Sequence, residues 1–320
     1  MFSNKSNRNL GIVLAVLTII VVVMFVSDDR NERTFRKNLI DIDTAKVSEI
    51  YITSKAHGQV SLVKENNFWK VKINENKSVP VPESKITAMF NQLLEIKPKR
   101  LAARSETKWA EFQVDSTGTR VIVKENGKTS LDLIIGRFAF QQPRTMNTYV
   151  RLGNDVDVYE VDGFLQATFN QNADSFRNGR ILGDVSGFEN WKNLEFIYPA
   201  DSSFQLVNMD NNWRTIKHSQ LDSSKTDQYL RQLSNLSASK FIDNIDPAEL
   251  ANPVYTLKIQ PGTGEMIQIN AYLFNSGSEN LEEDKIIISS TANIESLFDG
   301  NENDLWKKIF TGEAALLPKK

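Results

Sequence analysis

Residue types able to do chemistry are scarce in this sequence. Its 320 residues include no cysteine and only two histidines, His57 and His218. Without cysteine there can be no disulfide, no thiolate nucleophile and no cysteine-based zinc or iron–sulfur site. Neither histidine has acidic residues at ligand spacing, so we interpret both as surface turn residues. The sequence predicts no metal site.

Serine chemistry is also weakly represented. Serine and lysine occur three residues apart, as in penicillin-binding enzymes, at Ser61/Lys64, Ser105/Lys108 and Ser237/Lys240. The companion motifs are missing, and this many serines and lysines produce about two such pairs by chance. Gly-x-Ser-x-Gly, Gly-x-Gly-x-x-Gly and Walker sequences are absent as well. We therefore predict no catalytic residue, no cofactor and no nucleotide binding.

One acidic string could in principle hold calcium. Asp155, Asp157, Glu160 and Asp162 lack the central glycine and terminal glutamate of an EF-hand loop. The alternating pattern over residues 156–161 indicates a strand, which sends Asp157 and Glu160 to opposite faces. We interpret these acids as a solvated strand edge, where charge discourages aggregation between sheets.

Charge and composition narrow the class of partner. Lys plus Arg total 38 against 40 Asp plus Glu, for a net charge of -2, and 40% of residues are hydrophobic. This balance gives no electrostatic footprint for a nucleic acid, so we expect no nucleic-acid partner. The hydrophobic fraction is sufficient for a packed globular core.

An apolar segment near the N-terminus predicts a membrane anchor. Residues 10–26 carry no charge and are dominated by Val, Ile and Leu. As a helix they would extend roughly 25 Å, and the flanking basic residues can snorkel to reach both interfaces. The segment ends in Met24, Phe25 and Val26, which are too bulky for signal peptidase. We predict a cytoplasmic tail at 1–9, a transmembrane helix at 10–26 and a charged linker at 27–40.

The orientation of this anchor follows from its flanks. The short tail is basic, and Asp28 and Asp29 directly follow the apolar run. We therefore expect a single-pass protein of the inner (cytoplasmic) membrane, with the bulk of the chain facing the periplasm or cell exterior.

The part of the chain that follows the predicted anchor and linker contains an internal sequence repeat. Leu62, Val63 and Trp69 match Leu206, Val207 and Trp213, all 144 positions later, and each set surrounds an Asn-rich turn. An apolar stripe at helical spacing follows each set, with Gln92 and Leu93 corresponding to Gln232 and Leu233.

Hairpin signals follow each stripe in the same order. The clearest is Asn126-Gly127, flanked by alternating apolar residues. We therefore expect an α+β fold in which two tandem, duplicated units of mainly antiparallel sheet each carry one amphipathic helix, at 41–187 and 188–315.

The chain also resembles a known family. The segments that carry the resemblance are Ala45–Ile50, Asn67–Val71, Trp109–Asp115, Ile134–Gly136 and Thr148–Arg151 leading into Val158–Val161. Together with the N-terminal anchor they look like the bacterial domain-of-unknown-function family 4340, over roughly residues 40–310. The resemblance implies a membrane-anchored protein encoded beside gliding-motility-type ABC transporter components, and it implies no activity.

These observations lead to one expectation and two alternatives. We expect a non-enzymatic extracytoplasmic scaffold whose partner is a membrane protein such as an ABC transporter permease, the transporter link being implied by the resemblance alone. One alternative is an envelope hydrolase using two carboxylates about 5 to 10 Å apart. Another is a glycan- or cell-wall-binding module with exposed coplanar aromatics, but we interpret Trp69 and Trp213 as core residues.

Overall fold

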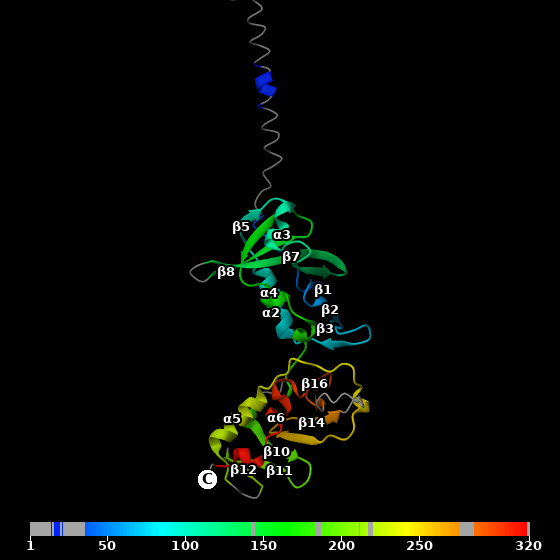
Figure 1. Ribbon diagram of the computed structural model, residues 1–320, viewed down its shortest axis with the longest axis vertical. Coiled ribbons are helices and arrows are strands. Elements are labelled where there is room, and N and C mark those ends of the chain that lie inside the picture. The colour runs from blue at the N-terminus through cyan, green and yellow to red at the C-terminus, as the bar shows by residue number, and fades with distance from the viewer. Residues whose placement is uncertain are drawn as a thin grey trace, which may run out of the picture.

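The computed structural model describes residues 14, 16–19, 21, 36–141, 145–183, 187–210, 212–216, 220–274 and 285–318. Two α+β units follow one another along the long axis of the molecule (Figure 1). Each unit has its own antiparallel sheet and its own hydrophobic core. The α+β class predicted from the sequence, with two antiparallel sheets, is therefore confirmed.

The first sheet contains nine strands within the described residues, in the order β4-β3-β2-β1-β6-β7-β8-β9-β5. Its strands are β1 Val47–Ser54, β2 Gly58–Glu65, β3 Phe68–Lys72, β4 Ser78–Pro80, β5 Pro98–Ala103, β6 Thr119–Glu125, β7 Lys128–Gln141, β8 Thr145–Leu152 and β9 Val158–Asp162.

The second sheet has seven strands in the part of the chain described, in the order β12-β11-β10-β13-β14-β15-β16. They are β10 Trp191–Ile197, β11 Phe204–Met209, β12 Asn212–Thr215, β13 Tyr255–Pro261, β14 Ile267–Phe274, β15 Lys285–Ser290 and β16 Leu297–Asp299.

The two sheets correspond strand for strand. The order β3-β2-β1-β6-β7-β8-β9 of the first sheet reappears as β12-β11-β10-β13-β14-β15-β16 in the second. Ile50 pairs with Leu62 in the first sheet, and Leu194 pairs with Leu206 in the second, each 144 positions later. A register shift after Val47 has its counterpart after Trp191, also 144 positions later. The architecture is therefore repeat-like down to the position of a β-bulge.

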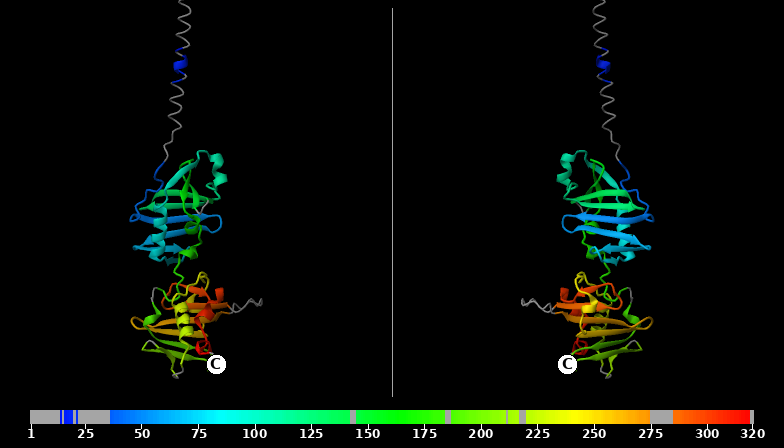
Figure 2. Two further views of the ribbon diagram at one scale, coloured as in Figure 1. Left: turned by 90° about the vertical axis from the view of Figure 1, so that its left-hand side faces the viewer. Right: turned by 90° about the vertical axis from the view of Figure 1, so that its right-hand side faces the viewer.

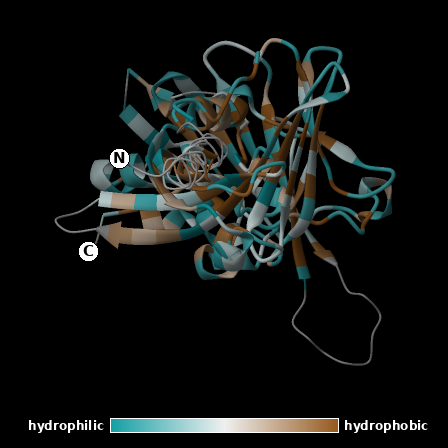
Figure 3. Cartoon of the chain, turned by 90° about the horizontal axis from the view of Figure 1, so that it is seen from above, coloured by the Kyte–Doolittle hydropathy of each residue, from teal (hydrophilic) through white to brown (hydrophobic). Residues whose placement is uncertain are grey.

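One amphipathic helix covers the core face of each sheet (Figure 2). Helix α2, Glu83–Leu94, buries Ile86, Met89, Phe90 and Leu93, while α5, Ser223–Ser234, buries Thr226, Tyr229, Leu230, Leu233 and Ser234. The ends of α5 and its first four buried positions lie 140 residues after those of α2. Seen along the long axis, apolar residues concentrate inside the units and polar residues occupy the outer loops (Figure 3).

Short helices complete both units. The first contains η1 Glu106–Lys108, α3 Trp109–Phe112, α4 Gln166–Phe169 and η2 Ala173–Phe176; the second contains η3 Phe188–Asn190, η4 Pro247–Glu249, η5 Glu302–Asp304, α6 Leu305–Ile309 and α7 Glu313–Leu316.

The turns predicted from the sequence form tight hairpins. Asn126 and Gly127 both have positive φ angles, 49° and 80°, and they connect β6 to β7 in a two-residue loop. Asn66 and Asn67 do the same between β2 and β3, with φ angles of 49° and 68°. Two successive positive φ angles are what a type I′ turn requires, which explains the selection of Asn and Gly.

A structured segment joins the units. Phe176 packs in the first core, whereas Ile181 packs in the second. Between them, the amine of Lys85 donates to the carbonyls of Ser175 and Arg177, both at 2.7 Å. From the other side, Asn293 Nδ2 donates to the carbonyls of residues 178 and 180, and the Ala238 N–H donates to that of Gly179. The backbone of this segment is thus held from both units.

The N-terminal predictions lie mostly outside the described residues. This applies to the tail at 1–9, to most of the transmembrane helix at 10–26 and to most of the linker at 27–40. Across the described residues, no helix combines the length and apolar character needed to cross a bilayer. The anchor and the division of the chain at 187/188 stay predictions; Ile181 and Leu182, which precede that division, belong to the second core.

Candidate functional site

The residues singled out from the sequence do not converge on a site. His57 is exposed in the β1–β2 turn, where its backbone N–H donates to Ser54 Oγ. His218 lies outside the described residues. No group of three or more His, Cys, Asp or Glu side chains that could hold a metal ion occurs in the described part of the chain.

The serine–lysine pairs have structural roles. Ser105 caps η1 by accepting from the Thr107 N–H, and Lys108 donates to Glu111. Lys240 forms an ion pair with Asp299 at 2.8 Å. Ser61 lies in the middle of β2.

The acidic string does not form the solvated edge that we expected. Glu160 is buried in β9, where Asn147 Nδ2 donates to it at 2.5 Å and Arg100 pairs with it. Asp157 is buried as well. The expectation was wrong because β9 lies between β8 and β5, so it is not an edge strand.

The two repeated tryptophans belong to the packing of the cores. Trp69 is 8% exposed and meets Phe90 edge to face, with ring centroids 6.0 Å apart. Trp213 is half-buried and packs against the second core. This packing confirms the core interpretation and weakens the glycan-binding alternative, which required exposed coplanar rings.

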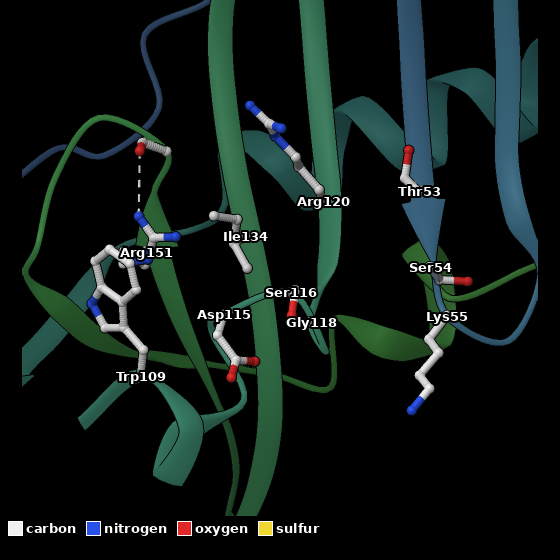
Figure 4. Close-up of a pocket in the computed structure, with 11 residues that line it drawn as sticks. Thr53, Ser54, Lys55, Trp109, Asp115, Ser116, Gly118, Arg120, Ile134 and Arg151 are labelled. Atoms are coloured by element: carbon white, nitrogen blue, oxygen red, sulfur yellow. Dashed lines mark hydrogen bonds between the residues drawn. The ribbon is translucent and has the colours of Figure 1, made fainter. Parts of the chain in front are cut away.

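A pocket of about 530 Å³ opens instead on the other face of the first sheet, away from α2 (Figure 4). Its floor is one row of side chains across four neighbouring strands. Thr53 of β1 pairs with Arg120 of β6, Arg120 with Ile134 of β7, and Ile134 with Arg151 of β8. Because paired residues of a sheet share a face, all four side chains point to the same side.

Trp109 and the loop at residues 115–118 form the walls of this pocket. Helix α3 ends at Phe112, and the next residue, Gln113, has a φ of 54°, which turns the chain back across the sheet. Phe112 anchors the helix against Tyr149, with ring centroids 4.5 Å apart. Gly136 allows this close approach, because a Cβ there would lie only 2.2 Å from the Phe112 carbonyl oxygen.

Arg151 is the most constrained side chain of the pocket. It is 5% exposed, and its guanidinium lies 3.7 Å from the centre of the Trp109 ring. Nε donates to the Val114 carbonyl, and Nη1 donates to the carbonyls of Leu152, Gly153 and Asp155, at 3.0 to 3.3 Å. Burial lowers the pKa of Arg151, although an arginine stays charged at neutral pH.

The acids near the pocket are engaged locally. Asp132 receives two hydrogen bonds from Arg120, at 2.9 and 2.7 Å, which raise the pKa of that arginine. The hydroxyl and backbone N–H of Thr117 both donate to Asp115 and lower the pKa of its carboxyl group. Asp115 is the only carboxylate among the described residues lining the pocket, so this arrangement suits binding better than proton transfer.

The described strands of the second unit do not carry this row of cations. The corresponding row there is Ile197, Thr256, Asn270 and Ser289, which pair successively across β10, β13, β14 and β15. Both arginines of the first row are thus replaced by neutral side chains. Sequence reasoning missed the pocket because Arg120 and Arg151 look like ordinary outward-facing strand residues; comparing the two repeats row by row would have revealed them.

A second notable surface lies on the β7–β8 hairpin, which extends beyond the body of the first unit (Figure 1). Phe138, Phe140 and Met146 are exposed on it, and Phe138 meets exposed Phe164 with ring centroids 4.9 Å apart. Phe140 pairs with Met146, and Phe138 pairs with Thr148. We call these four residues, Phe138, Phe140, Met146 and Phe164, the apolar hairpin surface.

Comparison with known proteins identifies the family alone. No curated protein and no solved structure matches the chain. Residues 69–253 match the family described as a domain of unknown function, DUF4340. This stretch is more than half of the chain and contains both the pocket walls and the β7–β8 hairpin. The chain therefore belongs to the DUF4340 family, as its strand, turn and Trp109–Asp115 segments had indicated.

Proposed function

We propose that this protein is a membrane-anchored extracytoplasmic scaffold, accessory to an ABC-type transporter of the gliding-motility class, which binds a partner and performs no catalysis of its own. The apolar run at residues 10–26 supports the membrane location. The transporter link is carried by the family resemblance.

The apolar hairpin surface is the observation that carries the binding role. Phe140 is 62% exposed, and it is accompanied by Phe138 and Met146 on the same hairpin and by Phe164, which follows β9 and contacts Phe138. Water-exposed clusters of large apolar side chains on otherwise polar surfaces mark sites of protein association. Phenylalanine and methionine are also among the residues enriched in protein–protein interfaces.

The register of the hairpin explains why this surface is uncovered. A bulge after Ile135 lets Phe138 pair with Thr148 on the same face as Ile135 and Val150, which belong to the first core. The hairpin thus continues the core-facing side of the sheet past the end of the core. A partner placed against it would extend that core across an interface.

The hydrolase alternative has less support. Paired-carboxylate catalysis needs two acids facing one another across a cleft. In the described pocket Asp115 is the single lining carboxylate, and Asp132 nearby accepts hydrogen bonds from Nε and Nη2 of Arg120. The charge of Asp132 is therefore balanced by Arg120, and Asp132 does not line the pocket beside Asp115 as the second acid of a catalytic pair would.

Site-specific photo-crosslinking in native membranes tests the scaffold proposal. A benzophenone amino acid replacing Phe140 in the full-length protein should capture a membrane-protein partner, which mass spectrometry would identify as a transporter permease. The same group at Phe68, which is 72% exposed on β3, is the matched control and should capture none.

Two outcomes would contradict the proposal. One is crosslinking at Phe68 and Phe140 to the same extent; the other is repeated absence of any membrane protein at Phe140. A Phe140→Ser variant should keep the fold, because the side chain is exposed, and should lose co-purification of the partner.

A further inference from the structure

The pocket on the first sheet contains a buried cation without a carboxylate partner in the described chain. Every hydrogen bond that Arg151 donates goes to a neutral backbone carbonyl. Of the acids whose charge acts on Arg151, Asp132 is held by Arg120 and Asp155 pairs with Arg36 at 3.5 Å, while Glu106 is an exposed residue of η1. Burying an arginine is costly, and carbonyl dipoles leave its net charge in place.

The neighbouring groups add to this positive charge. Lys55, Arg120 and Arg151 line the pocket together with a single acid, Asp115. Lys55 is exposed at the end of β1, on the side of the pocket opposite Trp109 (Figure 4). Among the lining residues themselves, three cations stand against one acid, although Asp132, Glu106 and Asp155 nearby also act on the charge of Arg151. A concave surface in which one sign of charge predominates concentrates ions of the other sign.

Two large apolar side chains lie among the rest of the lining, beside the hydroxyls of Thr53, Ser54 and Ser116. Ile134 forms the middle of the floor and the Trp109 ring forms one wall. The volume of about 530 Å³ is within the range typical of sites for small organic ligands. A ligand that fits both properties has an anionic group and an apolar body.

Arg151 is also preorganised for such a ligand. Four carbonyl contacts and the Trp109 ring hold its guanidinium in one place, so little side-chain entropy remains to be lost on binding. Nη2 is the nitrogen without a hydrogen bond to the described residues, and the stick view shows one guanidinium nitrogen directed toward Ile134 (Figure 4).

The second unit argues against a purely architectural role for these cations. Its sheet has the same register and the same bulge, yet its row is Ile197, Thr256, Asn270 and Ser289. The fold therefore forms without the two arginines. Their presence in one unit alone is explained by a ligand of that unit.

We propose that the pocket of the first unit binds a small anionic ligand, a carboxylate or phosphate attached to an apolar group, with the anion on the free nitrogen of Arg151, the apolar group against Ile134 and Trp109, and Lys55 and Arg120 adding positive charge on the far side of the pocket. This site is separate from the apolar hairpin surface and does not depend on the scaffold function.

Ligand-observed NMR titration of the full-length protein tests the site with defined probes. Phenylacetate and phenyl phosphate should bind saturably, and the stronger of the two names the anion preferred. Phenylacetamide has the same apolar body without the charge and should bind about tenfold more weakly, as expected for loss of a charge-assisted hydrogen bond. Equal binding of phenylacetate and phenylacetamide, or no binding of either anion, would overturn the proposal.

Two variants locate the binding. Lys55→Gln replaces an exposed side chain, so the fold should persist while phenylacetate binding weakens. Lys72→Gln, at an exposed position of β3, is the matched control and should bind like the parent. An identical effect of the two substitutions would place the anion elsewhere and refute the site. Crosslinking at Phe140 should be unchanged in both, which separates this test from that of the scaffold.

Discussion

Arg177 Nη1 donates to Asp243 Oδ2 at 2.7 Å and so ties the segment between the units to the second unit. The arginine is 1% exposed, and its guanidinium lies 3.8 Å from the centre of the Phe241 ring. Lys77, in the turn before β4 of the first unit, donates to the other oxygen of Asp243 at 2.7 Å. One carboxylate thus holds both units in a fixed relation.

Replacing this carboxylate should weaken the junction. Among the described residues, Asp243→Asn leaves Arg177 with Asp174, at 3.2 Å, as its one charged partner, and we expect a loss of about 2 to 4 kcal/mol in unfolding free energy. Chemical denaturation measures the loss, and small-angle scattering should show a wider range of distances between the units. Asp227→Asn, on the exposed side of α5, is the control and should change neither.

The carboxyl group of Asp243 also makes the stability of the protein depend on pH in acidic solution. Burial acts to raise the pKa of Asp243, but hydrogen bonds from Arg177 and Lys77 outweigh it, and the pKa lies below the ordinary value of 3.8. A lowered folded-state pKa contributes stability that is complete above the unfolded-state value and is lost as the pH falls through the folded-state value. The stability difference between the parent and Asp243→Asn should therefore be constant above about pH 5 and shrink in more acidic solution. A difference that grew on acidification would contradict this assignment.

Gly136 controls the wall of the pocket. Gly136→Ala would place a Cβ 2.2 Å from the Phe112 carbonyl oxygen, so α3 must move away from the sheet. We expect a loss of about 1 to 3 kcal/mol in stability and weaker phenylacetate binding. Gly312→Ala is the matched control, since its Cβ would meet nothing within 4 Å and its φ of -85° suits alanine. Similar effects at both positions would show that the close contact is unimportant.

Trp69 and Trp213 should differ in how much they contribute to the unfolding free energy. Trp69→Ala removes a buried ring that packs on Phe90, and we expect a loss of about 3 to 5 kcal/mol. Trp213→Ala removes a half-buried ring and should cost less than half as much. Urea denaturation measures the loss of unfolding free energy in each variant. Equal losses would contradict this prediction and would mean that the two tryptophans are packed equally well.

Local chemistry explains what could be predicted from the sequence. Asn126-Gly127 selects a type I′ turn by its backbone preference, and the apolar spacing of Ile86, Met89, Phe90 and Leu93 selects a helix with one buried face. Each signal depends on a few neighbouring residues, so it can be recognised without knowledge of the rest of the fold. The repeat made them stronger, because each signal occurs twice in the same order.

Strand neighbours explain what could not be predicted. From the sequence alone, Glu160 looks like a residue of an edge strand. The structure shows that β5, some sixty positions earlier in the chain, pairs with β9 and covers that edge. Arg120 and Arg151 become one site only through the pairings of β6 with β7 and β7 with β8. Such pairings depend on the whole sheet, and the spacing of residues along one strand carries no record of them.

The segment between the units also has a mechanical consequence. The carbonyls of residues 177 to 180 all accept hydrogen bonds from side chains or backbone of the flanking units. A force applied at the second unit would load these bonds together, because they hold neighbouring residues of one short stretch. This segment would therefore transmit tension and torque to the first unit, whereas a flexible linker would extend under load and transmit little of them.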